Sequence, residues 1–195
     1  PINTYSTNVM GTVNMLEAIR RTESVRSAIN VTTDKVYHNK EWEWGYREYE
    51  ELNGFDPYSN SKSCAELVTA SYKRSFPGLP PISTVRAGNV IGGGDFSLDR
   101  IIPDCVRAVE QGVDIVVRNP YSIRPFQHVL EPVCIYLALA LKQEEDIIYA
   151  GCYNVGPDES DCITTGELVE LFCRKSAEQG LTDPRWINKS DGGPH

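Results

Sequence analysis

Two short stretches of the sequence carry side chains that can move protons. Thr32 to Lys35 follow the apolar run SAINV, and Tyr58 and Lys62 lie four positions apart in the stretch YSNSK. On a helix, residues four apart share a face, and an ammonium group beside a phenol lowers the phenol's pKa from about 10. Such a phenol can take a proton from a hydroxyl group while hydride leaves the same carbon. The adjacent charges of Asp34 and Lys35 also suit a solvated strand end, so spacing alone leaves their role open.

The elements that must position these residues follow from the apolar patterns. Periodic apolar residues predict helices over about 4–21, 57–75, 101–112, 131–143 and 164–180. Short apolar runs predict strands over about 27–33, 82–90, 114–119 and 151–156. Asp56 is a suitable N-cap for the second helix, with Pro57 in its first turn, and Gly112 suits the C-cap of the third. Helices alternating with strands predict βαβ units and a parallel sheet.

Ligands of parallel sheets bind at the carboxyl ends of the strands. Thr33 lies at one such end, and the loop from Arg86 to Gly94 lies at another. These two loops are therefore expected to face one crevice.

Composition and charge limit the class of protein. The chain has 195 residues, of which 41% are hydrophobic and 24% charged, as in ordinary folded domains. Its net charge of -8 argues against a nucleic-acid or acidic-membrane partner. The longest apolar run, CIYLALAL, is far below the roughly 18 residues of a membrane span. The 6 cysteines form no CxxC pattern and no His cluster accompanies them, so we expect reduced cysteines, a cytoplasmic location and no metal site.

Four motifs in a fixed order indicate a family. NVMGTVNMLEA, VTTDKVY, YSNSK and VRAGNVIGGG resemble the extended short-chain dehydrogenase/reductases, which bind NAD(P) and act mostly on nucleotide sugars. The resemblance implies an α/β fold with a Rossmann-like doubly wound parallel sheet and a small α/β substrate-binding domain. Residues 1–90 would form the second half of the NAD-binding domain. Residues 91–195 would form mostly the substrate domain, with about 128–155 returning to the Rossmann sheet.

The Gly-rich fingerprint that opens such folds does not occur in its usual place. The cluster GGGD at 92–95 follows a late strand and lacks the required spacing. The chain is therefore expected to begin after roughly the first three βα units of the domain, and to carry the catalytic residues without the pyrophosphate loop.

The triplet Thr33-Asp34-Lys35 narrows the resemblance. Sugar-nucleotide 4,6-dehydratases usually carry Thr-Asp-Glu at this strand end, and epimerases a small residue followed by an apolar one. Lys in place of Glu, together with EWEWGYRE, RAGNVIGGGDFSLDRIIPDC and RNPYSIRPFQHVLEP, resembles the CDP-glucose 4,6-dehydratases. This implies NAD-dependent dehydration of CDP-glucose to CDP-4-keto-6-deoxyglucose, for deoxysugars of cell-surface polysaccharide. Another nucleotide-sugar 4,6-dehydratase, a 4-epimerase, and a nucleotide-binding scaffold without catalysis stay open as alternatives.

The resemblance also implies a role for each residue of the two stretches. Tyr58, helped by Thr33 and Lys62, would take the 4-hydroxyl proton while hydride passes to NAD. Asp34 would protonate the leaving 6-hydroxyl, which requires a raised pKa of its carboxyl. Lys35 would act as acid/base at C5, which requires a pKa lowered from about 10.4. Stabilisation of an enolate by Lys35, or a water as base, is the alternative.

Further contacts are implied for the cofactor and the substrate. The expected NAD contacts are Thr32, Tyr58 and Lys62, and the expected substrate contacts are Thr33, Asn89, Arg100 and Arg124. A pyrophosphate needs arginines and amide donors, and Arg100 precedes a helix whose N-terminus favours anions. For Asn89, Arg100 and Arg124, the alternative is a solvated loop side chain with no role in binding. Relatives pair the Tyr58 helix and the first helix with a partner's copies, which implies a homodimer.

Overall fold

The computed structural model describes residues 1–180 and 184–190. The chain divides into two compact units. Unit 1 comprises Pro1–Gly88 and Leu130–Gly156, and unit 2 comprises Asn89–Val129 and Pro157–His195. The chain therefore passes between the units three times. Within the residues that the structure describes, no helix has the length and apolar character needed to cross a membrane.

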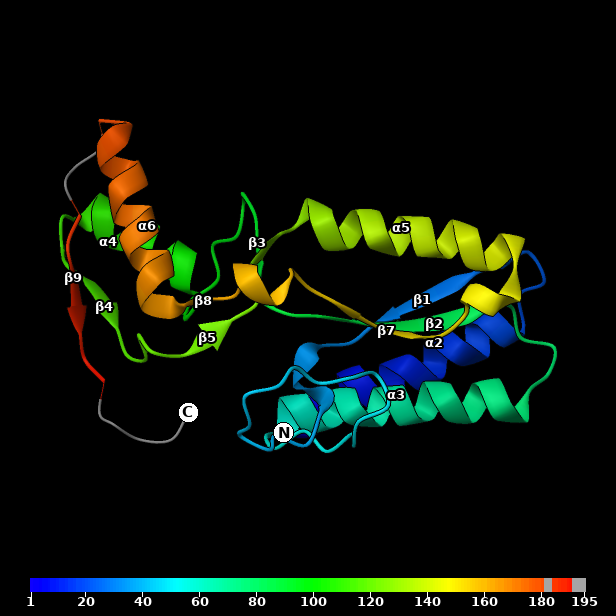
Figure 1. Ribbon diagram of the computed structural model, residues 1–195. Coiled ribbons are helices and arrows are strands. Elements are labelled where there is room, and N and C mark those ends of the chain that lie inside the picture. The colour runs from blue at the N-terminus through cyan, green and yellow to red at the C-terminus, as the bar shows by residue number, and fades with distance from the viewer. Residues whose placement is uncertain (181–183, 191–195) are drawn as a thin grey trace. The chain divides into compact units, whose positions relative to one another are not determined.

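Unit 1 is built on a three-stranded parallel sheet with the order β1-β2-β7 (Figure 1). Its strands are β1 (Ala28–Val31), β2 (Ile82–Ala87) and β7 (Cys152–Val155). β2 pairs with a neighbour on each edge and is buried from Ile82 to Arg86, which suits its apolar and β-branched sequence. The predicted α/β class with a parallel sheet is confirmed.

Helices cover both faces of this sheet. α5 (Leu130–Glu145) lies on one face, and α2 (Gly11–Arg20) and α3 (Pro57–Ser75) lie on the other (Figure 1). The predicted bounds of α3 are confirmed, including Asp56 as its N-cap.

The first helix runs from Ile2 to Arg20, close to the predicted 4–21, but it is not α-helical throughout. α1 (Ile2–Tyr5) leads into a π-helical turn, Ser6–Met10, before α2 begins. The Thr12 hydroxyl donates a 2.7 Å hydrogen bond to the Asn8 carbonyl oxygen, a side-chain bond of the kind that perturbs the backbone ladder of a helix. A π-helical turn of this sort is often found at functional sites.

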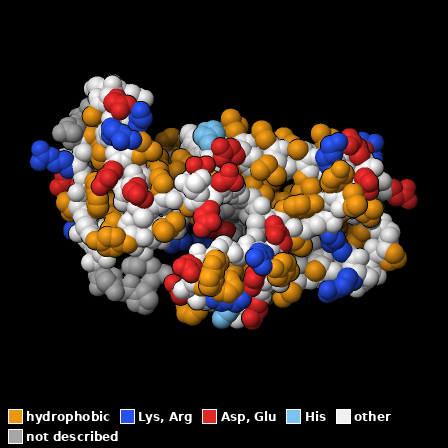
Figure 2. All heavy atoms as spheres, in the orientation of Figure 1, with side chains coloured by type: hydrophobic (Ala, Val, Ile, Leu, Met, Phe, Trp, Pro, Cys, Tyr) orange, Lys and Arg blue, Asp and Glu red, His pale blue; other side chains and the backbone are white. Residues whose placement is uncertain are grey.

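α5 is held on the sheet partly by a polar side chain. Gln143 is fully buried and donates to the carbonyl oxygens of Ala28 and Pro81, at the starts of β1 and β2. Much of the apolar surface of this helix is exposed, and Figure 2 shows hydrophobic side chains along it. These exposed residues include Leu130, Val133, Ile135, Leu137 and Leu141.

Unit 2 has its own apolar core between two helices and a small sheet. Its main elements are α4 (Ile101–Gln111), β4 (Ile115–Val117), α6 (Thr165–Glu178) and β9 (Trp186–Asn188), with β4 and β9 parallel. The core consists of Cys105, Ala108, Ile115, Val117 and Val169. α4 ends at Gly112, whose φ of +66° is the left-handed conformation predicted for a C-cap.

Two pairs of short strands complete unit 2. β3 (Val90–Ile91) pairs in parallel with β6 (Gln127–His128), and β5 (Ile123–Arg124) pairs antiparallel with β8 (Ile163–Thr164). The prediction of a single strand over 82–90 was therefore wrong. β2 ends at Ala87, and the chain begins a new strand in a different sheet at Val90.

Candidate active site

The helix that carries Tyr58 and Lys62 has a well-defined start. The carboxylate of Asp56 accepts hydrogen bonds from the backbone amides of Tyr58, at 2.9 Å, and Ser59, at 3.2 Å. The Ser59 hydroxyl also donates to Asp56, and these bonds lower the pKa of the Asp56 carboxyl. Because the first turn is fixed in this way, the position of Tyr58 on the helix is fixed with it.

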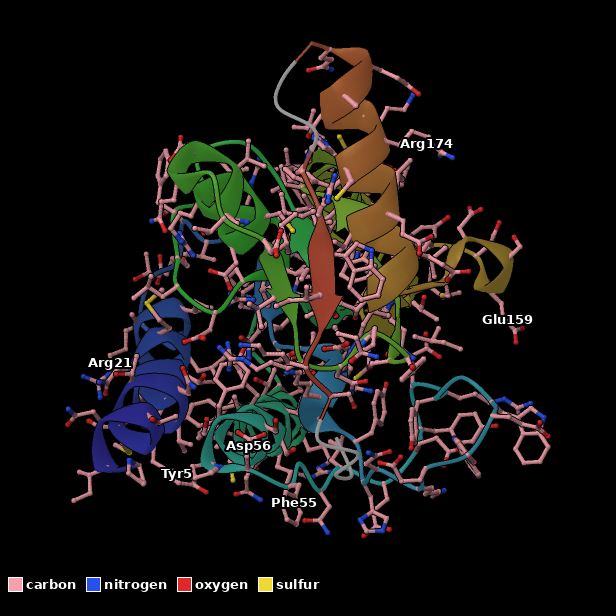
Figure 3. All side chains as sticks on the ribbon, turned by 90° about the vertical axis from the view of Figure 1, so that its left-hand side faces the viewer. Tyr5, Arg21, Phe55, Asp56, Glu159 and Arg174 are labelled. Carbon is pink, nitrogen blue, oxygen red and sulfur yellow. The ribbon has the colours of Figure 1, made fainter. Side chains whose placement is uncertain are left out.

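The N-terminal helical segment braces the same end of α3. Figure 3 labels Tyr5 in this segment and Asp56 at the start of α3. The Tyr5 hydroxyl donates to Asn60 Oδ1 at 3.0 Å, and Asn8 Nδ2 donates to Ser61 Oγ at 2.9 Å. Asn8 lies in the π-helical turn, so this irregular turn contacts the helix next to Tyr58.

β1 ends in polar residues that enter a 3₁₀ turn, Asp34–Val36. The backbone amide of Thr32 still donates to Val85, which extends the pairing of β1 with β2 by one residue. The Thr33 hydroxyl donates to the Asp34 carboxylate at 3.0 Å and accepts from the Lys35 amide at 3.4 Å. Thr33 is buried, Asp34 half-buried and Lys35 exposed, so the predicted triplet runs from the interior to the solvent.

Lys62 connects α3 to the end of β1. Its Nζ donates to the carbonyl oxygen of Val31 at 3.2 Å. Burial lowers the pKa of Lys62, and the negative charge of Glu66, one turn further along α3, opposes this effect. Tyr58, one turn earlier, is 46% exposed. The contact therefore brings the Tyr–Lys helix to the strand end that carries Thr32 and Thr33.

A buried ion pair lies one helical turn beyond Lys62. The side chains of Glu66 and Arg86 are each 2% exposed, and the Arg86 guanidinium donates to both carboxylate oxygens at 2.8 and 2.9 Å. The Thr32 hydroxyl donates to the same carboxylate at 2.5 Å. Burial disfavours the charge on Glu66, but the bonds from Arg86 and Thr32 outweigh burial and hold the pKa of Glu66 below its ordinary value.

Sequence reasoning missed this pair, although a signal was present. Arg86 is a charged residue within the otherwise uncharged strand ISTVRA, and a buried charge needs a partner. Glu66 follows Lys62 by four residues and so shares its helical face.

Arg86 also bonds to the segment that follows the 3₁₀ turn. Its Nη1 donates to the Tyr37 hydroxyl oxygen at 2.6 Å and to the Glu48 carbonyl oxygen at 2.9 Å. The Tyr37 hydroxyl donates to Asn154 Oδ1 at 2.5 Å. The Tyr37 ring stacks on Tyr46, with centroids 5.2 Å apart and planes 10° apart. Asn154 in turn donates from Nδ2 to the Tyr46 carbonyl oxygen at 2.8 Å, so Arg86 and Asn154 join the ends of β2 and β7 to residues 38–53, called here the aromatic loop.

The aromatic loop carries two tryptophans and many carboxylates. Trp42 and Trp44 meet edge to face at 5.8 Å, and the Lys40 ammonium lies 4.2 Å from the centre of a Trp42 ring. Trp42 is 36% and Trp44 64% exposed, and Figure 2 shows acidic side chains around hydrophobic ones over this loop. The loop therefore presents aromatic rings to solvent, while the bonds from Arg86 and Asn154 fix its backbone.

The other predicted substrate contacts lie in unit 2. Asn89 is half-buried, and its carbonyl oxygen accepts from the Gln127 amide at 2.9 Å. Arg100 is the exposed residue that precedes α4, and Arg124 is half-buried in β5. Their contacts with a substrate stay predictions. Over the described ranges, no group of His, Cys, Asp and Glu is arranged to hold a metal ion.

Comparisons with known proteins give consistent matches. Residues 1–156 match the NAD dependent epimerase/dehydratase family. The chain is 45% identical, over an alignment of 205 residues, to CDP-glucose 4,6-dehydratase of Salmonella typhimurium. That alignment covers 100% of this chain and 55% of the relative.

Solved structures share the fold. dTDP-glucose 4,6-dehydratase from Bacillus anthracis, in complex with NAD, has a TM-score of 0.76 at 25% identity and covers 97% of this chain and 57% of its own. UDP-N-acetylglucosamine 4-epimerase from Methanobrevibacter ruminantium has a TM-score of 0.78 at 21% identity, over 99% of this chain and 59% of its own. The second match shows the fold alone.

Proposed function

The chain belongs to the NAD dependent epimerase/dehydratase family, and on that premise we propose that it is the catalytic part of a CDP-glucose 4,6-dehydratase. The observation that carries the proposal is the bond from Lys62 Nζ to Val31, which brings the Tyr–Lys helix to the Thr33-Asp34-Lys35 strand end. The 45% identity to the Salmonella enzyme supports CDP-glucose as the substrate. The chain spans 55% of that relative's length, so the proposal concerns the protein encoded by its complete reading frame.

The polar groups at the end of β1 fit a nicotinamide dinucleotide. The Lys62 ammonium has three donors, and its bond to Val31 uses one of them. The half-exposed Tyr58 phenol adds a donor and acceptor one turn away, so the pair can bind the ribose hydroxyls, with Thr32 as the third expected contact. When bound, NAD supplies the acceptor and the donor of hydride.

In the proposed reaction Tyr58 takes the proton of the sugar 4-hydroxyl. The Lys62 ammonium, one turn along the helix, stabilises the negative charge that develops on the Tyr58 oxygen as this proton is taken. Because Lys62 is partly buried, the local dielectric around it is lower than in water, which strengthens this electrostatic effect. The buried Thr33 assists Tyr58 from the end of β1.

Asp34 and Lys35 carry out the elimination of water in this proposal. Asp34 donates a proton to the leaving C6 oxygen, and the Thr33 hydroxyl orients its carboxyl group. Lys35 removes the C5 proton as a neutral amine. A water as base, with Lys35 stabilising an enolate, is the alternative within the same reaction.

The finer assignments belong to the same proposal. Asn89, Arg100 and Arg124 bind the nucleotide diphosphate, and the protein acts in the cytoplasm in the synthesis of deoxysugars for lipopolysaccharide O-antigen. It acts as a homodimer through α2 and α3. Exposed Met15 on α2 and Leu67 on α3 support such an interface, which sedimentation analysis of the full-length protein would test.

The central test incubates the protein from the complete reading frame with NAD and, separately, CDP-, dTDP- and UDP-glucose and GDP-mannose, in deuterated water. Mass spectrometry and NMR should show loss of one water and deuterium at C5 with CDP-glucose only. Dehydration of another sugar nucleotide alone would contradict the substrate. A product inverted at C4 without loss of water would identify a 4-epimerase, and no turnover of any substrate would favour a binding protein.

Replacement of Tyr58 by Phe tests the proton acceptor. We expect kcat to fall by about 10²- to 10⁴-fold, because this is the usual contribution of general acid–base catalysis. Tyr72→Phe on the same helix is the matched control and should keep nearly full activity. Equal losses in the two variants would contradict the role of Tyr58.

A further inference from the structure

We infer that Glu66 and Arg86 are positioning residues, which hold the Lys62 ammonium at the end of β1 and fix the aromatic loop beside it. The inference rests on the proposed function, since it assigns Lys62 to the reaction. Neither residue belongs to the Tyr–Lys helix motif or to the Thr33-Asp34-Lys35 triplet.

The first step is the register of α3 against β1. Three polar side chains on one face of the helix bond to three consecutive residues of the chain, namely the last two residues of β1 and the residue that follows it. The bonds join Lys62 to Val31 at 3.2 Å, Glu66 to Thr32 at 2.5 Å and Thr69 to Asn30 at 2.8 Å. Hydrogen bonds have narrow limits of distance and angle, so these three bonds together admit one register. Glu66 lies between Lys62 and Thr69 on the helix, and it is buried where Lys62 is not.

The second step is the shape of the Arg86 guanidinium. Its Nε and Nη2 donate to Glu66, and its Nη1 donates to Tyr37 and to the backbone of Glu48. A planar guanidinium presents donors in two directions at fixed angles, which a lysine ammonium cannot reproduce. Arg86 therefore fixes the position of the aromatic loop relative to the helix that carries Lys62.

The third step is the charge near Lys62. The charged and titratable groups on the elements around this end of α3 are Tyr58 and Glu66 on α3 itself, Arg86 on β2, Asp34 and Lys35 in the 3₁₀ turn, and Tyr37 after it. Tyr37 stays neutral, because burial raises its pKa. Glu66 is ionised and favours the ammonium form of Lys62, whereas burial favours the neutral amine. Neutralising Glu66 should therefore lower the pKa of Lys62, so that the ammonium is lost at a lower pH.

Three variants separate these effects in the full-length protein. Glu66→Leu with Arg86→Met removes both charges and leaves neither unpaired, so the protein should still fold. Arg86→Lys keeps the positive charge but loses the planar guanidinium that donates in two directions. The control is Arg26→Gln with Glu144→Gln, which removes an ion pair of unit 1 whose side chains are 75% and 31% exposed.

Two measurements require no turnover. NMR titration of ¹³C-labelled lysines, with Lys62 assigned through Lys62→Arg, should show its pKa lowered in the double variant, which has lost the charge of Glu66, and unchanged in the control. Hydrogen exchange of amides 38–53 should become at least about tenfold faster in the double variant and in Arg86→Lys, as expected for local opening of a loop that has lost its fixed contacts.

Kinetics provide the third measurement. The double variant should show kcat reduced by about 10- to 100-fold, with the alkaline limb of its pH profile moved to lower pH and KM for the sugar nucleotide little changed. A double variant whose Lys62 pKa and loop exchange equal those of the wild type would overturn the inference, even if kcat fell. If the wild type does not dehydrate any sugar nucleotide, the proposed function fails, while the pKa and exchange results still decide this inference.

Discussion

α3 of unit 1 and α4 of unit 2 are both packed against strands, but by different kinds of side chain. The buried residues of α3 are Ser59, Ser61, Ser63, Ala65, Glu66 and Thr69, whereas the core around α4 consists of Cys105, Ala108, Ile115, Val117 and Val169. Apolar contact is non-directional, while hydrogen bonds have strict geometry. The helix that carries the proposed proton acceptor is therefore the one whose position is fixed by directional bonds.

The largest difference should appear when one member of the buried pair is removed. Arg86→Met alone should lower the free energy of unfolding by about 3–5 kcal/mol, because it leaves the buried Glu66 carboxylate without its partner. Adding Glu66→Leu should recover most of this loss. Urea denaturation, with hydrogen exchange of the β2 amides, measures both effects. A loss below about 1 kcal/mol for the single variant would mean that the pair behaves like an exposed one.

The apolar core should respond in proportion to the volume removed. Ile115→Ala should cost about 2–4 kcal/mol through lost burial and a residual cavity, and Ile115→Val about 1 kcal/mol. The loss should appear first in the exchange of amides of unit 2. Glu66→Leu is expected to recover the stability lost in Arg86→Met, because the two residues form one pair. No single second substitution should recover the stability lost in Ile115→Ala. If one did, unit 1 and unit 2 would not differ in how they are held together.

The N-cap of α3 should contribute less and should depend on pH. Asp56→Ala should cost about 1 kcal/mol at pH 7. Since bonds from Ser59 and Tyr58 lower the pKa of Asp56, the contribution is present above its unfolded pKa of about 3.9 and is lost as pH falls through the folded value.

Denaturation of the wild type and of Asp56→Ala between pH 7 and pH 2 should give curves that converge at low pH. Asp56→Asn keeps a capping acceptor that does not titrate, and its difference from Asp56→Ala should stay constant with pH. If the free energy of unfolding of the wild type differed from that of Asp56→Ala by the same amount at every pH, the carboxylate of Asp56 would not be the cap.

The smallest effect is expected at an exposed ion pair of unit 2. Lys175 and Glu178 lie 2.7 Å apart on α6, with side chains 60% and 52% exposed. Lys175→Gln should cost about 0.5 kcal/mol or less, and less again in 1 M salt, because exposed pairs are screened. Thermal unfolding at low and high salt measures this. A loss similar to that of Arg86→Met would show that exposure does not separate the two kinds of ion pair.

The elements of the fold were predictable where a local pattern specifies them. α3 begins after Asp56 as predicted, because an N-cap and a proline in the first turn both mark this start. The C-cap at Gly112 was predicted for a similar reason. Both signals depend on residues within a few positions of the feature that they mark.

The missed features depend on residues far apart in the sequence. Glu66 and Arg86 pair only because α3 packs on β2 in one register, which no local period encodes. The π-helical turn contains Asn8, which bonds to Ser61 on α3, and apolar spacing over 4–21 carries no signal for either feature. The break after Ala87 is tertiary as well, since Val90 finds its partner at Gln127.

The threefold passage of the chain between the units bears on how the protein is made. β2 is complete at Ala87, but its partner β7 begins at Cys152, after the first segment of unit 2 and all of α5. At a synthesis rate of about 5–20 residues per second, several seconds pass between the synthesis of β2 and that of β7, and one edge of β2 stays unpaired during this time. Unit 2 likewise needs its second segment, from Pro157, before α6 can cover α4. Neither unit can then finish folding during synthesis before the other has begun, and a nascent chain stalled near Val129 exposes an incomplete version of both.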